Sequence, residues 1–369
     1  MTDLYQKKAR HSLTRRRFLK AGASIAAGAV AAPTILSKRA AAADELNVLT
    51  WCDHLDPRLI GPFEEEHGVR VNLKDYEGTG AALALLEQSG PGDWDVWVVN
   101  SNDVPEVAKQ INFSVLSESD FDLDNVFPET REPLFHYKDG NMIAVPEKFG
   151  YSSIAFNREK VDVEDMQTIS VLWNEKYAGR IGIFDWYQPV MQTLLVCNGG
   201  DPKNMTMADL EPIREQLLKI KKVVALISDV VTCQTAIATG DIDILGGGAE
   251  FIVAQLAASE KPELDWVVPK EGASRWMQSI TILEDSTRKD LALKFLQYIM
   301  SNEGQARLAT SECFWAMPTN MNAALSDAEK KALRWDKQPE YLANTVYDIR
   351  QGPELDQAQI DIWAEFLQA

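Results

Sequence analysis

The sequence predicts a mixed α/β protein built from two α/β regions. From residue 46 onward, apolar runs typical of buried strands alternate with helix-like stretches, the pattern of βαβ units and a parallel sheet. A second region of this kind begins after residues 141–157, and the chain then returns to the first. The length of 369 residues is sufficient for two domains.

The first region contains three strands and two helices. The strands are predicted at residues 46–51, 69–73 and 94–99, and the helices end near residues 67 and 88, the first of them stopped by Gly68. Ligands of α/β sheets collect at the carboxyl ends of parallel strands. Two groups of residues occupy those ends and are candidate ligand contacts: Trp51, Cys52 and Asp53, and Asn100, Ser101 and Asn102.

The second region contains a strand at 180–185, a long helix at 207–222 and a strand at 243–245 that leads into three glycines. Strands at 266–269 and 279–282 and a helix at 289–300 follow, in the part that returns to the first region. We therefore expect a first lobe from 44–150, a second lobe from 151–275, and a return to the first lobe from 276–369, with C-terminal helices packing across both lobes.

The N-terminus has the form of a twin-arginine export signal. Residues 14–20 read T-R-R-R-F-L-K, an alanine-rich stretch follows, and small residues at 40–43 provide an A-x-A-like cleavage site. A run of roughly 20 strongly apolar residues is needed to span a bilayer, and this one is short and interrupted by Pro33. We expect cleavage after residue 43 and a mature protein that is free in the periplasm.

Charge argues against nucleic acid as a partner. Residues 1–43 hold nine of the 37 Lys and Arg but one of the 55 Asp and Glu, so the remainder has a formal charge of −26. Such a surface repels nucleic acid and anionic membranes and attracts cations.

The cysteines and histidines give no metal or redox motif. Cys52, Cys197, Cys233 and Cys313 are widely separated, with no C-x-x-C pair, and their disulfide pairing cannot be deduced from spacing. The four histidines show no metal-binding spacing. We expect no metal, no cofactor and no catalytic residues.

Several short motifs occur in a characteristic order, at residues 49–53, 63–71, 76–77, 94–96, 145–157, 173–179, 269–279 and 318–320. With these motifs, residues 46–320 resemble the periplasmic spermidine/putrescine-binding proteins of ABC transporters. The resemblance implies the type II periplasmic binding protein fold, with two lobes joined by hinge strands and a ligand cleft between them. It also implies ABC permease subunits as partners, and we expect a monomer.

The resemblance implies specific cleft contacts. Trp51 and Trp276 match aromatic walls, and Asp53 matches a carboxylate that holds an ammonium group. An indole face and a hydrogen-bonded carboxylate both stabilise a desolvated cation. Further candidates lie in or near the matched segments: Asp185, Trp186, Tyr187, Glu250, Gln278 and Trp315.

The sequence also departs from the family pattern. Gln278 replaces an acidic residue, Asp185 is the only acid in its segment, and residues 246–250 replace a tryptophan-led loop. Glu77 and Glu250 are candidates to restore the lost charge. Because each buried ammonium needs a partner, the remaining aromatic set would also suit a quaternary ammonium, a sulfonium or a zwitterion, with Arg275 at an anionic end.

Together these observations predict the periplasmic binding component of an ABC importer that takes a small, polyamine-like organic cation. The alternatives are a betaine-like or aminophosphonate ligand on the same fold and, more distantly, an exported thiol hydrolase using Cys52.

Overall fold

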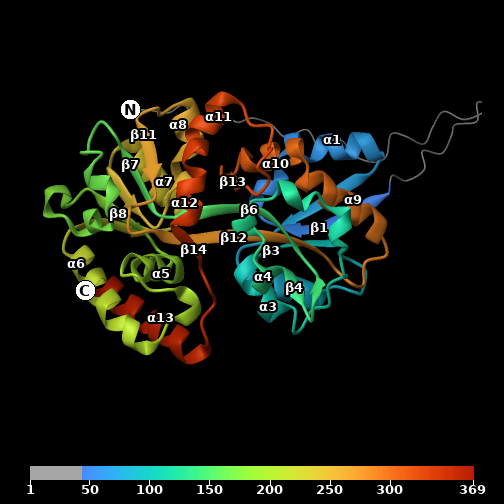
Figure 1. Cartoon of the computed structure of the whole chain (residues 1–369), viewed down its shortest axis with the longest axis horizontal. Coiled ribbons are helices and arrows are strands. Elements are labelled where there is room, and N and C mark those ends of the chain that lie inside the picture. The colour runs from blue at the N-terminus through green and yellow to red at the C-terminus, as the bar shows by residue number, and fades with distance from the viewer. Residues whose placement is uncertain (1–43) are drawn as a thin grey trace, which may run out of the picture. The chain divides into compact units, whose positions relative to one another are not determined.

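The structure, a computed structural model, describes residues 44–369. The predicted export signal at residues 1–43 lies outside the described residues. The described chain forms two large β-sheets flanked by helices, and a small two-stranded one (Figure 1). We call the part around the seven-stranded sheet the first lobe and the part around the five-stranded sheet the second lobe.

The first sheet has the strand order β13-β6-β12-β3-β1-β2, and β14 pairs with β12. Its strands are β1 (Glu45–Thr50), β2 (Arg70–Asp75), β3 (Val96–Asn100), β6 (Val145–Ser152), β12 (Ala273–Ile282), β13 (Met317–Pro318) and β14 (Thr345–Tyr347). The second sheet has the order β11-β7-β10-β8-β9. Its strands are β7 (Ile154–Asn157), β8 (Ile181–Phe184), β9 (Val224–Ser228), β10 (Ile244–Gly246) and β11 (Leu264–Val267). A small hairpin joins β4 (Tyr137–Lys138) to β5 (Asn141–Met142).

Helices separate most of the strands. They are α1 (Pro57–His67), α2 (Thr79–Gln88), α3 (Val104–Val107), α4 (Pro133–His136), α5 (Tyr187–Cys197), α6 (Leu210–Lys221), α7 (Val230–Thr239), α8 (Glu250–Ser259), α9 (Lys289–Met300), α10 (Asn302–Ala309), α11 (Asp327–Ala332), α12 (Gln338–Ala343) and α13 (Pro353–Gln368). Helix α1 illustrates how the sequence sets these bounds. The Asp56 carboxylate accepts from the Arg58 amide at its start, and Gly68 ends it in a left-handed conformation.

The prediction of an α/β fold is confirmed, but the expectation of a parallel sheet was incomplete. Strands β1, β2 and β3 are parallel, whereas β12 runs antiparallel to both β3 and β6. The first sheet is therefore mixed. The cause is topological: β6 leaves the first lobe and β12 re-enters it, so the two strands lie side by side in opposite directions (Figure 1).

Several segments connect the lobes. The chain passes from β6 to β7 at Ser153, returns between β11 and β12, and reaches the second lobe again after β13, where α11 packs on α8. It then places β14 beside β12, and α13 packs on α5 and α6 of the second lobe. The long strands β6 and β12 therefore carry residues that face both lobes.

Candidate functional site

The predicted contacts of the first lobe lie where β1 and β3 end, beside the middle of β12 and β6. Gln278 of β12 stands directly opposite Asn100 of β3 and Lys148 of β6. Trp276, two residues earlier, stands opposite Gly150. Directly paired residues share a face of a sheet, and so do residues two apart along a strand. Asn100, Lys148, Trp276 and Gln278 therefore lie on one face.

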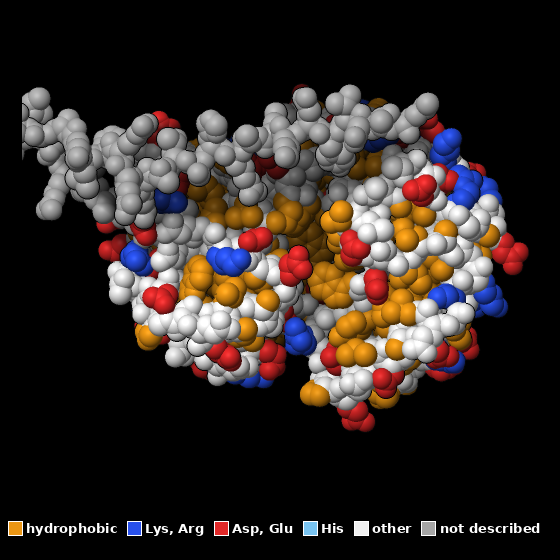
Figure 2. Space-filling view, turned by 180° about the vertical axis from the view of Figure 1, so that it is seen from behind, with side chains coloured by type: hydrophobic (Ala, Val, Ile, Leu, Met, Phe, Trp, Pro, Cys, Tyr) orange, Lys and Arg blue, Asp and Glu red, His pale blue; other side chains and the backbone are white. Residues whose placement is uncertain are grey.

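Trp276 is the centre of an aromatic cluster on this face. Its half-buried ring lies 5.9 Å from the Phe251 ring of α8 and 6.1 Å from the Phe314 ring, measured between centroids. The ring centroid of Phe251 lies 6.2 Å from that of Phe184, which in turn lies 5.9 Å from that of Trp186. We call these five rings the aromatic surface. Residues of both lobes contribute to it, and Figure 2 shows apolar side chains along the hollow between the two halves of the molecule.

A buried carboxyl group lies against this aromatic surface. Glu250, the first residue of α8, is fully buried, and its carboxylate accepts from the Tyr151 amide at 3.1 Å. Gly150 makes room for it, because a Cβ at that position would collide with both Glu250 and Trp276. Burial raises the pKa of Glu250 to about 8. Within residues 44–369, no Lys, Arg or His forms an ion pair with this carboxyl group.

Asp53 is in a different electrostatic state, because internal cations neutralise it. The fully buried Asp53 carboxylate lies 3.0 Å from Lys148 Nζ and 3.0 Å from His54 Nδ1. Burial would raise the pKa of Asp53, but Lys148 and His54 outweigh it and hold that pKa far below its usual range. The other ring nitrogen of His54 lies 3.2 Å from Glu147. Burial favours neutral imidazole, yet the carboxylates of Glu147 and Asp53 raise the pKa of His54 to about 10.

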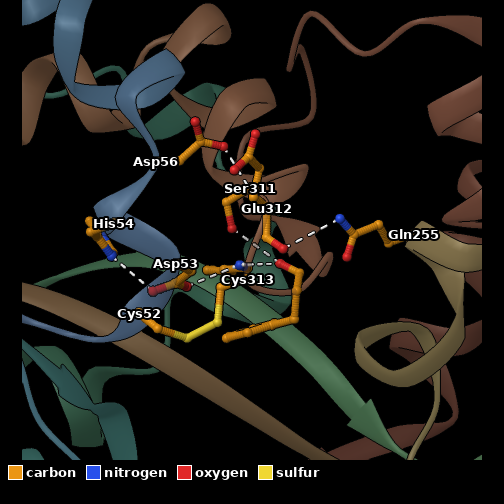
Figure 3. The surroundings of a disulfide bond; sticks show 10 residues. Cys52, Asp53, His54, Asp56, Gln255, Ser311, Glu312 and Cys313 are labelled. Atoms are coloured by element: carbon orange, nitrogen blue, oxygen red, sulfur yellow. Dashed lines mark hydrogen bonds and ion pairs between the residues drawn. A yellow bond between two sulfur atoms is a disulfide. The ribbon is translucent and has the colours of Figure 1, made fainter. Parts of the chain in front are cut away.

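Next to Asp53, Cys52 is bonded to Cys313 (Figure 3). The suggestion of a thiol nucleophile at Cys52 was therefore wrong, since the sulfur is held in a disulfide. The bond ties the end of β1 to the loop that carries Phe314. The adjacent Glu312 carbonyl accepts from Gln255 of α8, so this loop also contacts the second lobe.

The remaining first-lobe candidates differ in whether other residues of the chain already contact their side chains. The Trp51 ring packs on Tyr76 at 4.6 Å, so the two predicted indole walls, Trp51 and Trp276, have different aromatic partners. Trp51 Nε1 and Gln278 Oε1 are buried and lack a hydrogen-bond partner within the described chain. Ser101 shares a hydrogen bond with Ser279.

Contacts with the C-terminal segment occupy several other candidates. Asn102 donates to Asp348 at 3.0 Å, Tyr187 donates to Asp356 at 2.8 Å, and Asp185 accepts from Trp363 at 2.7 Å. Trp315 is half-buried and packs against the larger apolar core. The structure thus places Trp186, Glu250 and Trp276 at the aromatic surface. The four candidates named in this paragraph, Asn102, Asp185, Tyr187 and Trp315, have other contacts instead.

Two further candidates lie away from the aromatic surface. Arg275 points to the opposite face of β12 from Trp276, where its guanidinium stacks on Tyr347 at 4.4 Å and donates to the Leu342 carbonyl. Glu77 is exposed after β2.

The sequence-based prediction omitted Lys148, Phe251 and Phe314. Their signals were present in the sequence. Glu147 and Lys148 are two charged residues in an otherwise largely apolar strand segment, and each phenylalanine adjoins a residue that was singled out, Glu250 or Trp315. Charged residues inside a buried strand require partners and so indicate a built electrostatic site.

Other features of the described residues lie outside this site. A cavity of about 460 Å³ on the first lobe is lined by residues that include Arg131, His136 and Tyr137, and by none of the predicted contacts. Residues 44–369 contain no group of three or more His, Cys, Asp or Glu placed to hold a metal ion. In the same range, no helix combines the length and apolar character needed to cross a bilayer.

Comparison with known proteins places this geometry in a family. The family model described as bacterial extracellular solute-binding protein matches residues 58–340. Spermidine/putrescine-binding periplasmic protein 1 of Haemophilus influenzae is 26% identical over 73% of this chain and 74% of its own length. The spermidine/putrescine-binding periplasmic protein of Escherichia coli is 26% identical over 75% of this chain and 78% of its own length.

A solved structure shares the fold. It is the substrate-binding protein PotD of a spermidine/putrescine ABC transporter from Streptococcus pneumoniae, with a TM-score of 0.75 and 20% identity. The match covers 88% of this chain and 99% of that protein, which confirms the type II binding-protein fold. The chain belongs to the bacterial extracellular solute-binding proteins.

Proposed function

We propose that this chain is the periplasmic binding component of an ABC importer and that its ligand is a small organic cation of polyamine type. The observation that carries the proposal is the buried Glu250 carboxyl beside the half-buried Trp276 ring. Trp276 and Glu250 belong to different lobes, so a ligand held by both would favour lobe closure.

The chemistry of this pair suits an alkylammonium group. An ammonium is stabilised by the face of an indole and more strongly by a carboxylate that accepts hydrogen bonds from it. Phe251 and Phe314 extend the apolar wall for an aliphatic chain. The names of the relatives support a polyamine-like ligand over the quaternary ammonium, sulfonium or zwitterionic alternatives.

Calorimetric titration of the purified chain with putrescine, spermidine and butylamine tests this function, with glucose and glutamate as negative solutes. We expect saturable binding of amines alone. Replacing Trp276 with alanine should weaken amine binding by about tenfold or more. Trp94→Ala is the matched control, because Trp94 is also half-buried but precedes β3, at the end opposite to Asn100. Absence of amine binding, or equal affinities for W276A and the wild type, would contradict the proposal.

Export by the twin-arginine pathway is a second part of the proposal, and the motif at residues 14–20 supports it. Replacing Arg15 and Arg16 together with lysine should leave the uncleaved chain in the cytoplasm. Cell fractionation would measure this. Recovery of the processed double variant from the periplasm would contradict twin-arginine export.

A further inference from the structure

Lys148 has surroundings that a binding protein would offer to an ammonium ligand. Its Nζ lies 3.0 Å from the Asp53 carboxylate and 3.1 Å from the Phe314 carbonyl oxygen. The same nitrogen sits 3.9 Å from the centroid of the Phe314 ring. A carboxylate, a carbonyl and an aromatic face are the three kinds of partner that stabilise a desolvated ammonium group.

The lysine is entirely enclosed. Lys148 and Asp53 are both 0% exposed, although a flexible lysine side chain normally keeps its charge in water. Burial lowers the pKa of Lys148, and Asp53 opposes that effect. The chain therefore places one of its own ammonium groups beside the carboxylate that the family resemblance assigns to the ligand.

The surrounding charges are balanced. Asp53 and Glu147 provide two carboxyl groups, and Lys148 and His54 provide two basic groups, all fully buried. No excess negative charge is left in this cluster for a second cation. Glu250, by contrast, has no ion-pair partner within the described residues.

Phe314 connects this cluster to the aromatic surface, because its ring contacts both Lys148 and Trp276. Lys148 and Trp276 also share a face of the sheet, paired with Gln278 and Gly150 respectively. A diamine held at Glu250 and Trp276 would meet Lys148 if its second ammonium extended toward Asp53. Like charges in a desolvated site repel strongly.

We infer that Lys148 occupies the ammonium position at Asp53 and restricts the buried part of the site to a single ammonium of the ligand. This inference rests on the proposed function and deepens it. Lys148 is then a specificity-determining residue, because it excludes a second buried positive charge of the ligand. The site can still bind ligands whose other end is neutral or remains in solvent.

Putrescine and butylamine provide a matched pair of probes, because they share a four-carbon chain and differ in one ammonium group. In calorimetric titrations, the wild-type chain should bind butylamine at least as tightly as putrescine. Replacing Lys148 with methionine keeps an unbranched apolar side chain, one atom shorter, and removes the charge, which frees Asp53 for the ligand. We expect putrescine affinity to rise by about tenfold or more and butylamine affinity to change by less than about threefold.

The double variant Lys148→Met with Asp53→Asn is the control. It removes both charges, so it should fold without a buried unpaired carboxylate and should show no gain for putrescine. Thermal unfolding of each variant verifies the fold. If K148M fails to fold, the wild-type preference between the two probes still decides the matter.

The outcomes separate the two claims. A wild-type preference for putrescine of about tenfold or more, or equal putrescine affinity in a folded K148M and the wild type, would overturn the role of Lys148 while leaving amine binding intact. Absence of binding of either amine to any of the proteins would overturn the proposed function, and this inference with it.

Discussion

Lys148 and Asp53 form a fully buried ion pair, with Lys148 Nζ 3.0 Å from Asp53 Oδ2. His54 lies on the other side of the same carboxylate and bridges it to Glu147. Four charged groups from two distant segments thus fold into one closed network beneath the aromatic surface. The network fixes the C-terminal end of β1 relative to the middle of β6. Its charge balance depends on all four residues.

The first prediction concerns this network. Asp53→Asn should lower the free energy of unfolding by about 3–5 kcal/mol, because it leaves Lys148 buried without its carboxylate. Glu106→Gln is a matched control, because it removes one partner of the exposed pair with Lys109, and it should cost about 1 kcal/mol or less. Chemical denaturation at neutral pH measures both. Similar losses in the two variants would show that the buried pair has no special role.

The disulfide gives a second prediction. Cys52 and Cys313 are separated by 261 residues, so their bond closes a long loop of the unfolded chain. Replacing both with serine should lower the free energy of unfolding by about 2–5 kcal/mol. A reducing agent should lower the free energy of unfolding of the wild type to near that of the double variant. Cys197→Ala, which alters an unbonded cysteine, should cost less and should leave the effect of reductant intact.

The third prediction concerns pH. Burial raises the pKa of Glu250 to about 8, above its usual value of 4.5. A group with a raised pKa in the folded state stabilises the protein at low pH, and this contribution is lost as the pH rises through the folded pKa. Unfolding free energy should therefore fall between pH 5 and pH 9 by an amount on the order of a few kcal/mol.

Glu250→Gln should flatten that pH dependence, because the amide oxygen can still accept from Tyr151 but cannot ionise. The exposed Glu215→Gln is the control and should retain the wild-type slope. Denaturant titrations at pH 5, 7 and 9 measure the three curves. His54, whose pKa rises from 6.5 to about 10, and Asp348, whose pKa burial raises to about 7, add losses of stability in overlapping pH ranges. Both variants should keep these losses, so E250Q should reduce the slope without removing it. Parallel curves for E250Q and the wild type would contradict the assigned role of Glu250.

A fourth prediction uses Gly150. Its Cα lies so close to Glu250 and Trp276 that a Cβ would collide with both side chains. Gly150→Ala should displace the indole and the carboxyl and weaken amine binding by about tenfold. Gly61→Ala in α1 is the control, because a Cβ there meets nothing within 4 Å. Calorimetric titration compares the two, and unchanged affinity in G150A would place the ligand elsewhere.

Much of the fold was predictable because apolar periodicity is a local property. The strand at 46–51 and the helix at 289–300 correspond closely to β1 and α9. Strand direction is not local, so periodicity could not show that β12 runs antiparallel to β3. The order of family motifs indicated the two-lobed fold, and the matching solved structure confirms it.

The site was less predictable, because its state depends on partners distant in sequence. Asp53 is separated from Lys148 by 95 residues, and Cys52 from Cys313 by 261. Composition and spacing contain no information about such pairings. The match to a family motif identified Trp276 as a candidate contact, whereas only the fold shows that Phe251 and Phe314 flank it.

A crystal structure of the chain with a bound amine tests the central claim most directly. We predict one ammonium nitrogen within about 6 Å of the Trp276 ring centroid, in contact with the Glu250 carboxyl, while Lys148 stays on Asp53. An amine bound away from the aromatic surface, for example in the cavity beside His136, would contradict the account.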